Sequence, residues 1–299
     1  MKLPDLAELL ALRGAARKLG LHVQRHARGS LLGSHRSSHR GRGLEFEEVR
    51  PYIEGDDPRS IDWRVTARRG RVHTKLFREE RERPVWLLVD LGCAMFFGSR
   101  LQLKSMVAVR AAALLAWSAT LGGDRVGAVI GNSSSIRVLP PRSREAGVLP
   151  ILNALVALQP RAPAAAATEG LFPALRTLAP LVHPGSYVWA LSDFGATRDE
   201  EQSLWSGMAA HSECRWLWIT DALEQHSLPN GRFRAGFPQP VVPIDGAGVR
   251  PQWLNAWRQR EARVRSGAEA LRIGLLQLDT GREVSENLGV ALQKSKSAA

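Results

Sequence analysis

Two aspartates follow apolar runs that have the character of buried strands. Asp90 comes directly after the run at residues 85–89, and Asp193 comes shortly after the run at residues 186–191. In a parallel sheet, ligands bind outside the carboxyl ends of the strands, where the chain turns towards a helix. We therefore expect the two acids to meet at one rim, where Thr168, just before a predicted helix, could supply a third oxygen. Oxygen ligands of this kind are what a hard divalent cation requires.

The elements that position this rim alternate along the chain after residue 84. Strands are predicted at residues 85–89, 125–130, 135–139, 186–191, 215–220 and 271–278, and helices at residues 99–121, 143–158, 169–181, 198–211 and 251–265. A hairpin is also predicted at residues 231–244. Strands that alternate with helices predict a doubly wound, mostly parallel α/β sheet with helices on both faces.

The N-terminal part of the chain has a different character. Apolar residues between positions 3 and 19 recur with the period of an amphipathic helix. Asp57 and Pro58 are residue types that begin a helix, and we expect a short helix there that Gly70 closes. The sequence thus predicts a helical and β extension followed by a sheet domain. The two predicted domains are residues 1–83 and residues 84–299.

The net charge of +12 is concentrated near the N-terminus. Residues 1–43 hold nine Lys and Arg residues against two acidic residues, a net charge of +7. Such a basic arm attracts acidic protein surfaces, anionic lipids or nucleic acids, and it is equally compatible with a solvated tail. The arginines concerned are Arg25, Arg28, Arg36, Arg40 and Arg42.

Composition argues against several classes of protein. No apolar run approaches the roughly 20 residues that a membrane-spanning helix needs, and residues 1–20 lack the apolar core of a secretory signal. Cys93 and Cys214 lie inside apolar segments, which favours thiols in a reducing compartment. We therefore expect a cytoplasmic protein. Because the common phosphate-loop, zinc-helix and nucleophile-elbow motifs are absent from the sequence, we do not expect an enzyme.

The loop after Asp90 connects the predicted sheet with a known fold. Strand and loop together resemble the von Willebrand factor A fold, whose metal site combines an Asp-x-Ser-x-Ser loop with a threonine and an aspartate from two further loops. Here Gly92 and Ala94 stand at both serine positions, so two hydroxyl ligands are missing. The resemblance implies a degenerate metal-site rim at Asp90, Gly92, Ala94, Thr168 and Asp193, held by hydrogen bonds. Weak Mg²⁺ binding at Asp90, Thr168 and Asp193 is the alternative.

A motif upstream of the sheet completes the resemblance. It reads Gly43-x-Glu45-Phe46, Arg50-x-Tyr52, Gly55-Asp56-Asp57-x-Arg59-x-Ile61-Asp62-Trp63 and Ala67-Arg68, with later matches at Phe97-Gly98, Lys104, residues 123–127, residues 192–194, residues 221–224 and residues 228–231. Together these motifs resemble the bacterial domain-of-unknown-function family numbered fifty-eight. Members are often encoded beside MoxR-type AAA+ ATPases and are thought to act with them, so the resemblance implies that partnership here.

Acids and arginines alternate in this upstream motif and can satisfy one another as bidentate pairs. One interpretation is structural: a charged network, covered by Phe46 and Trp63, clamps the N-terminal segment onto the sheet domain. The other is that part of the network faces a partner. The residues concerned are Arg50, Tyr52, Gly55, Asp56, Asp57, Arg59, Asp62, Trp63 and Arg68.

These features predict a noncatalytic protein–protein interaction module without a cofactor. We expect it to act as an adaptor or partner of a MoxR-type AAA+ ATPase in the assembly or remodelling of a complex, and an acidic protein client is a further candidate partner. Two alternatives stay open. The basic arm would make the protein a binder of nucleic acid or acidic lipid, and Asp90 with Asp193 would make it a weak Mg²⁺-dependent enzyme.

Overall fold

The chain is divided into two structural units. A computed structural model describes residues 2–19, 44–54, 56–79, 83–162, 170–195, 199–235 and 241–297. The first unit, the sheet unit, consists of residues 1–25 and 83–299, and the second, the small unit, consists of residues 26–82. The chain therefore begins in the sheet unit, forms the small unit, and then returns to the sheet unit.

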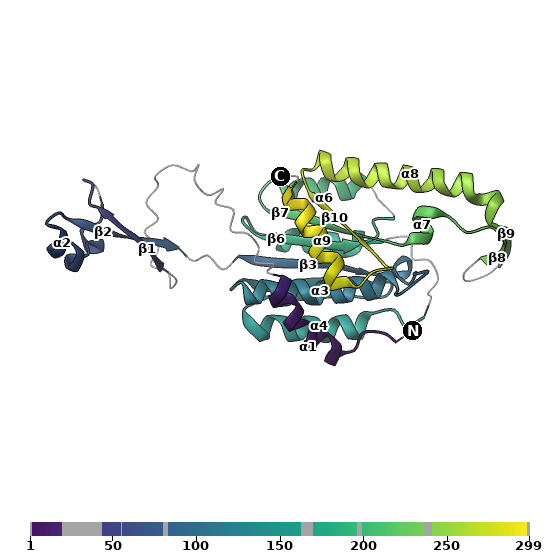
Figure 1. The fold of residues 1–299 in the computed structure, drawn as a ribbon, viewed down its shortest axis with the longest axis horizontal. Helices are drawn as coiled ribbons and strands as arrows, with labels where there is room; N and C mark the ends of the chain where they lie inside the picture. Colours follow the sequence, from purple (N-terminus) through teal and green to yellow (C-terminus); the bar gives the residue numbers. More distant parts are fainter. Residues whose placement is uncertain are drawn as a thin grey trace. The chain divides into compact units, whose positions relative to one another are not determined.

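The sheet unit contains a six-stranded sheet in the order β10-β7-β6-β3-β4-β5 (Figure 1). Its strands are β3 (Pro84–Leu91), β4 (Arg125–Asn132), β5 (Ile136–Arg142), β6 (Tyr187–Ser192), β7 (Glu213–Thr220) and β10 (Gly274–Asp279). Neighbouring strands are parallel, except that β4 and β5 form an antiparallel hairpin. This arrangement confirms the doubly wound, mostly parallel sheet that the sequence predicts. The strand order reverses between β3 and β6, and sheets of this kind bind ligands at such a point.

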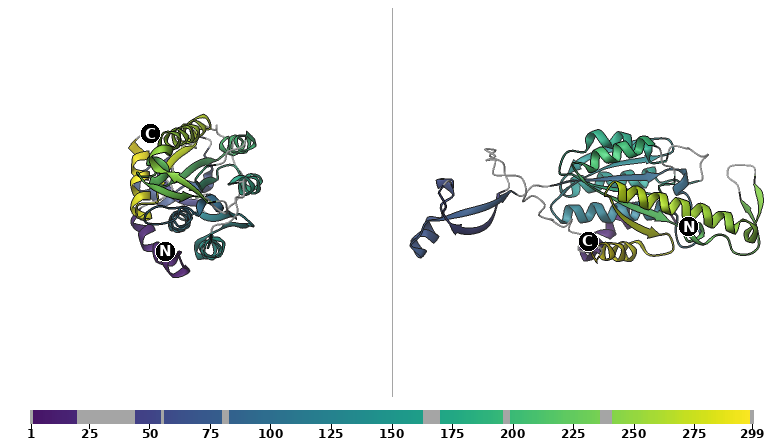
Figure 2. Two further views of the ribbon diagram at one scale, coloured as in Figure 1. Left: turned by 90° about the vertical axis from the view of Figure 1, so that its right-hand side faces the viewer. Right: turned by 90° about the horizontal axis from the view of Figure 1, so that it is seen from above.

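Helices lie on both sides of the sheet (Figure 2). On one side are α1 (Leu6–Leu19), α3 (Lys104–Leu121), α4 (Arg144–Leu158) and α9 (Val284–Ser297). On the other side are α5 (Phe172–Leu178), α6 (Asp199–Ala209) and α8 (Gly246–Ala270). In the described part of the chain, none of the helices has the length and apolar character needed to cross a membrane.

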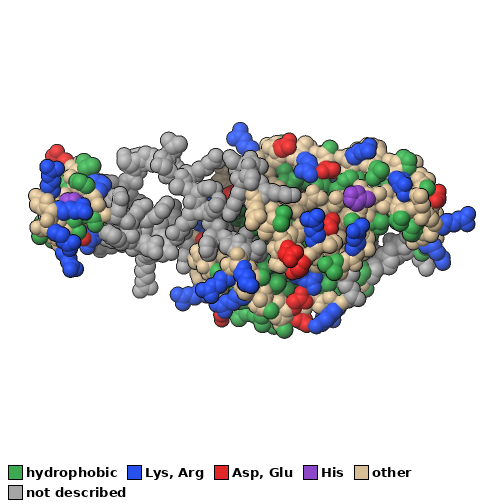
Figure 3. Space-filling view, viewed as in Figure 1, with side chains coloured by type: hydrophobic (Ala, Val, Ile, Leu, Met, Phe, Trp, Pro, Cys, Tyr) green, Lys and Arg blue, Asp and Glu red, His purple; other side chains and the backbone are tan. Residues whose placement is uncertain are grey.

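The small unit is a β-hairpin that carries a short helix. Its elements are β1 (Leu44–Pro51), η1 (Pro58–Ser60), α2 (Trp63–Arg69) and β2 (His73–Glu79). The single helix predicted from Asp57 is divided in two, because Ile61 forms a bridge with Thr74 of β2. Gly70 ends α2 in the left-handed conformation, with φ of 68°. Lys and Arg side chains are prominent on the visible surface of this unit (Figure 3).

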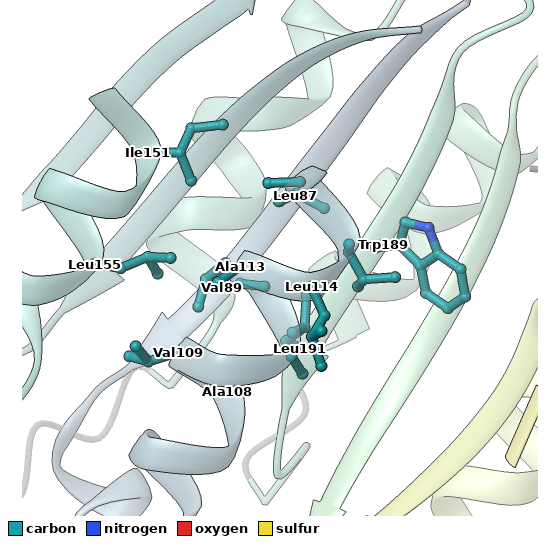
Figure 4. Close-up of a cluster of buried hydrophobic side chains, with 14 of the residues drawn as sticks. Leu87, Val89, Ala108, Val109, Ala113, Leu114, Ile151, Leu155, Trp189 and Leu191 are labelled. Atoms are coloured by element: carbon teal, nitrogen blue, oxygen red, sulfur yellow. The ribbon is translucent and has the colours of Figure 1, made fainter. Parts of the chain in front are cut away.

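Alternating side chains of β3 contribute to two hydrophobic cores. Leu87 and Val89 pack with α3 and α4 (Figure 4), whereas Trp86 and Leu88 pack with the helices on the opposite side. Residues 85–91 are all buried, and burying one large apolar side chain stabilises a fold by about 1.5–3 kcal/mol. The apolar run before the first aspartate is therefore a central strand, and its burial fixes the position of that carboxylate.

The first helix belongs to the sheet unit. Leu9 of α1 is fully buried, and the indole N–H of Trp117 in α3 donates a hydrogen bond of 3.0 Å to its carbonyl oxygen. Glu8 forms an ion pair of 2.6 Å with Arg110 of α3. The sequence grouped this helix with the rest of residues 1–83, whereas its contacts make it an outer layer over α3.

The C-terminal part of the sheet unit extends beyond the prediction. The hairpin predicted at residues 231–244 is present as β8 (Arg232–Ala235) and β9 (Val242–Asp245). Helix α8 begins at Gly246, capped by Asp245, and continues through Pro251, where the sequence predicted its start. The short helix α7 (Ala222–His226) and α9 were not predicted.

Candidate functional site

Asp90 lies at the carboxyl end of the central strand β3, with only 5% of its surface exposed. Its two carboxylate oxygens have different partners. Oδ1 accepts a hydrogen bond of 2.8 Å from the backbone N–H of Gly92, and Oδ2 accepts one of 2.7 Å from the hydroxyl of Ser192. Ser192 ends β6, so this bond joins the two strands between which the strand order reverses.

A cavity of about 570 Å³ lies at this point of the sheet edge. Its lining includes Asp90 near the end of β3, Gly92 and Ala94 in the loop after it, residues 133–135 of the β4–β5 turn, and Ser192 and Asp193 at the end of β6. The structure thus brings to one rim the two predicted aspartates and the two positions at which the von Willebrand factor A loop has serines. Thr168, the expected third oxygen, lies outside the described residues.

Asp193 belongs to a group of four charged side chains, which we call the buried ion cluster: Lys104, Asp193, Glu224 and Arg260. Lys104 Nζ lies 3.1 Å from the Asp193 carboxylate and 2.5 Å from that of Glu224. Arg260 lies 3.0 Å from each of the same carboxylates. Lys104 is only 1% exposed, although it is the first residue of α3. Because a cation at a helix N-terminus is unfavourable, the two carboxylates must stabilise it there.

The two aspartates of the rim differ in their electrostatics. Burial alone would raise the pKa of Asp193, but the Lys104 and Arg260 cations outweigh burial and hold it below its usual value. Burial, and then the negative charge of Asp193, raise the pKa of Asp90 to about 6. Asp193 is therefore neutralised by the buried ion cluster, while Asp90 carries its charge at a cost.

A third aspartate ties the loops after β3, β7 and β10 together. Asp221 follows β7 and accepts hydrogen bonds from the N–H and hydroxyl of Ser99, at 2.8 and 2.5 Å, and from the hydroxyl of Thr280. Glu224 accepts a bond of 3.1 Å from the N–H of Asp221, which completes a capping box for α7. Burial would raise the pKa of Asp221, but the bonds from Ser99 and Thr280 hold it below its usual value. Glu224 thereby links this group to the buried ion cluster.

The loop that carries Ser99 towards Asp221 depends on Gly98. A Cβ atom at this position would lie 2.2 Å from the carbonyl oxygen of Gln102. Nearby, the N–H of Lys104 donates a hydrogen bond of 2.8 Å to the carbonyl oxygen of Phe97. The Phe97-Gly98 motif therefore closes the loop that brings α3 and its lysine to the rim.

The divalent cation of the von Willebrand factor A metal site does not fit the residues that the structure describes at this rim. Gly92 and Ala94 offer no side-chain oxygen, so two of the ligands that such a cation requires are missing. Asp193 is paired with two cations from the protein itself. Over the ranges that the structure describes, no group of three or more His, Cys, Asp or Glu side chains could hold a metal ion. An ammonium and a guanidinium thus supply the positive charge beside Asp193.

The acids of the upstream motif have local roles in the small unit. Arg50 and Asp56 form a bidentate ion pair, with N–O distances of 2.9 and 2.8 Å. Asp57 caps η1 by accepting a hydrogen bond from a backbone N–H two residues ahead. Asp62 caps α2 and also lies 3.5 Å from Lys75. For the described residues, the partners of these three acids all lie between positions 50 and 75.

The remaining residues of this motif require one correction. Trp63 is 69% exposed, so it does not cover the charged pairs as expected. Arg59 and Arg68 are also exposed, while the Tyr52 hydroxyl donates a hydrogen bond of 3.1 Å to the Asp56 carbonyl oxygen. The clamp onto the sheet domain stays a prediction. Outside the described residues lie Gly55, the side chain of Phe46, and the arginines at 25, 28, 36, 40 and 42.

The contacts within the buried ion cluster are not indicated by the sequence. Lys104 and Glu224 stood within the family motifs, which was the available signal, but nothing in the sequence showed that they touch. Arg260 gave no signal, because it is one of several arginines on the long helix α8.

One family description matches most of the region that contains these motifs. The family described as "Protein of unknown function DUF58" matches residues 48–231. This chain belongs to the DUF58 family. The DUF58 match includes Lys104, Asp193, Asp221 and Glu224, and it ends before Arg260.

Known relatives of this DUF58 chain resemble it only in part. The chain is 37% identical over 153 residues to the uncharacterized proteins Rv1480 of Mycobacterium tuberculosis and Mb1516 of Mycobacterium bovis. The aligned region is 51% of this chain and 48% of each relative, so the chain spans about half the length of the curated relatives it matches. BatB from Bacteroides thetaiotaomicron aligns with a TM-score of 0.43 and 12% identity, over 72% of this chain and 99% of that one. An aerotolerance-related membrane protein from Bacteroides fragilis aligns with a TM-score of 0.42 and 12% identity, over 73% and 100%.

Proposed function

We propose that this DUF58 chain is a noncatalytic protein–protein interaction module that acts as an adaptor or partner of a MoxR-type AAA+ ATPase in the assembly or remodelling of a complex. The observation that carries the proposal is the cavity at the carboxyl edge of the sheet, in whose lining hydrogen bonds hold Asp90 to Ser192 and Gly92. The choice of an ATPase as partner rests on the family resemblance of the motifs.

The rim of the cavity is organised before a partner arrives. Ser192 binds Asp90 across β6 and β3, and Gly92 in the loop after β3 binds the same carboxylate. A rim held in this way loses little conformational freedom when a segment docks against it, so more of the contact energy appears as affinity. The arrangement therefore suits recognition of a folded or extended partner segment.

The acids at this edge are engaged in bonds within the protein, which supports a noncatalytic role. Asp193 and Glu224 are each paired with two cations, and Asp221 accepts bonds from two hydroxyls. A general base must reach a substrate proton and needs a pKa near the working pH. Asp193 and Asp221 have lowered pKa values, so neither meets this requirement.

Capture of the ATPase from the native host tests this proposal. The full chain would carry an affinity tag, and proteins retained in the presence of ATP would be identified by mass spectrometry. Ala94 is exposed and lines the cavity, so Ala94→Arg places a long side chain in the binding region. Ala210 is an equally small, exposed residue between α6 and β7, at the opposite edge of the sheet, and Ala210→Arg is the matched control.

We expect the wild type and Ala210→Arg to retain an AAA+ ATPase, and Ala94→Arg to lose it. Melting temperatures would show whether both variants remain folded. Recovery of no AAA+ ATPase by the wild type would contradict the proposed partner. Equal recovery by Ala94→Arg and the wild type would contradict the proposed binding surface.

A further inference from the structure

We infer that the cavity at the carboxyl edge takes up the side chain of a lysine or arginine from the segment that docks there, with Asp90 as its counter-ion. The inference deepens the proposed function and rests on it, because it names the chemistry by which the same cavity would recognise its partner.

The charges around the cavity do not balance. The buried ion cluster contains two acids and two bases, so its formal charges cancel. Asp90 lies beside this cluster, and it has no ion-pair partner among the side chains that the structure describes. Of the two acids that line the cavity, Asp193 is thus paired with cations and Asp90 is not, and a cation from outside would balance the charge of Asp90.

The cavity is acidic in a strongly basic chain. The protein has a net charge of +12, yet its described lining contains two aspartates and no Lys, Arg or His. The lining of the cavity is therefore negatively charged, although the chain as a whole is positively charged and repels cations at long range. A basic side chain is the ligand whose charge is complementary to such a lining.

Asp90 can accept further hydrogen bonds. Each of its oxygens accepts one bond from the protein, at 2.8 Å from Gly92 and 2.7 Å from Ser192. An ionised carboxylate has about four acceptor sites, so about two remain for an ammonium or guanidinium group. The same two protein bonds hold the carboxylate in one orientation, which favours a directed contact.

The walls of the cavity suit the rest of such a side chain. Lysine and arginine bury an aliphatic stem beneath a charged head. Ala94, Ile136, Leu171 and Pro173 provide apolar surface along the lining, and residues 133–135 provide hydroxyl groups. A partner's basic side chain would therefore find apolar contacts for its stem and an acid for its head.

The electrostatics of Asp90 agree with this geometry. Burial, and then Asp193, raise its pKa to about 6, so the ionised form lacks sufficient stabilisation within the protein. A bound cation would supply the missing charge, which is a reason for its binding to be favourable. A divalent metal would be the rival cation, but the residues at Gly92 and Ala94 leave it without the oxygen ligands that it requires.

NMR titration of the full chain tests the inference. The probes are Nα-acetyl-arginine methylamide, Nα-acetyl-lysine methylamide and the neutral isostere Nα-acetyl-citrulline methylamide. We expect the two basic probes to shift the amide signals of Gly92, Ala94 and Gly195 in a saturable manner, and citrulline to bind at least about tenfold more weakly. Equal binding of citrulline and arginine would overturn the inference, as would saturation of the same amides by Mg²⁺ at a lower concentration than by the basic probes.

Asp90→Asn removes the charge and keeps the shape of the side chain. We expect this variant to bind the arginine probe at least about tenfold more weakly than the wild type does. Glu145→Gln removes one exposed negative charge near the start of α4, and we expect it to bind like the wild type. Unchanged binding by Asp90→Asn would overturn the inference. If this variant does not fold, the comparison of arginine with citrulline on the wild type still decides.

The two proposals can fail separately. If Asp90→Asn captures the ATPase as well as the wild type while Ala94→Arg does not, the cavity binds the partner without a basic side chain, and the inference is wrong. If the basic probes bind selectively and no ATPase is captured, the recognition chemistry holds and the proposed partner is wrong.

Discussion

The carboxyl edge of the sheet and the upstream motif of the small unit use the same residue types in opposite ways. At the edge, Lys104 reaches acids that are 89 and 120 positions away in the sequence, and its side chain is 2% exposed. In the small unit, Arg50 reaches an acid six positions away, and the two side chains are 30% and 20% exposed. The first arrangement joins distant loops, and the second shapes one short segment.

The two kinds of contact have different energetic consequences. Caps and short-range pairs such as those of Asp57 and Asp62 satisfy local backbone groups. Removing one partner of a buried charged group leaves the other unpaired, which is much more costly than breaking an exposed pair. The long-range acids at the sheet edge are therefore the part of the motif set that joins distant loops.

The largest effect is expected for Lys104→Met. Loss of the ammonium leaves two buried carboxylates with Arg260 as their remaining cation in the cluster, so we expect the free energy of unfolding to fall by about 3–5 kcal/mol. Urea denaturation followed by tryptophan fluorescence measures it. Lys75→Met is the matched variant in the small unit, where the lysine is 39% exposed; a loss above about 1 kcal/mol there would break the comparison.

A smaller effect is expected from the titration of Asp90. Its pKa is about 6 in the folded protein and 3.8 ordinarily, so between these pH values the folded protein keeps a proton that the unfolded chain has released. Rising pH therefore lowers the free energy of unfolding through this group, by about 1.4 kcal/mol per pKa unit and about 3 kcal/mol altogether. The lowered pKa values of Asp193 and Asp221 act in the opposite direction, with stability lost towards acid pH.

Asp90→Asn isolates that contribution. The stability of the variant relative to the wild type should rise between pH 4 and pH 7 by about 3 kcal/mol and stay constant above. Denaturation at a series of pH values measures the difference. A difference independent of pH would contradict the raised pKa of Asp90.

A still smaller effect on stability is expected for the cap of α2. Asp62→Ala should destabilise this helix by about 1 kcal/mol, whereas Asp62→Asn should be nearly neutral, because asparagine caps helices as well as aspartate does. Hydrogen exchange of the α2 amides, which would be roughly fivefold faster in the alanine variant, measures the local effect. Equal loss in both variants would mean that the charge of Asp62, rather than its capping oxygen, is what matters.

The smallest effect is expected for the ion pair of Arg50 and Asp56. Both partners are partly exposed, so Arg50→Gln should change the stability of the small unit by less than about 1 kcal/mol. Hydrogen exchange in β1 and β2 measures it. A change of several kcal/mol would show that this pair resembles the buried ion cluster more than its exposure indicates.

The sequence was sufficient for the parts of the fold that depend on local pattern. The apolar run at residues 85–89 identified a buried strand, and the positions of Asp90 and Asp193 after their strands placed both at one rim. The turn residues Asp57 and Gly70 marked the ends of the α2 region, although pairing of Ile61 with β2 divided the helix. Tertiary pairing, which local propensity does not contain, accounts for that difference.

The parts that were missed depend on long-range contacts. Lys104 is a residue type that is almost never fully buried unless it is paired, and its partners come from β6 and the segment after β7. The burial of Leu9 likewise follows from packing of α1 on α3. A single sequence does not indicate which charged side chains or which helix faces come into contact. These contacts are therefore visible only in the structure.

The location of the partner-binding surface is tested most directly by comparing one variant from each region in the same capture experiment. Ala94→Arg changes the cavity at the sheet edge, and Trp63→Ala removes the 69% exposed tryptophan of the small unit. We expect Trp63→Ala to retain the AAA+ ATPase like the wild type and Ala94→Arg to lose it. Loss of the ATPase by Trp63→Ala, with full retention by Ala94→Arg, would contradict the proposed binding surface and place the partner on the upstream motif instead.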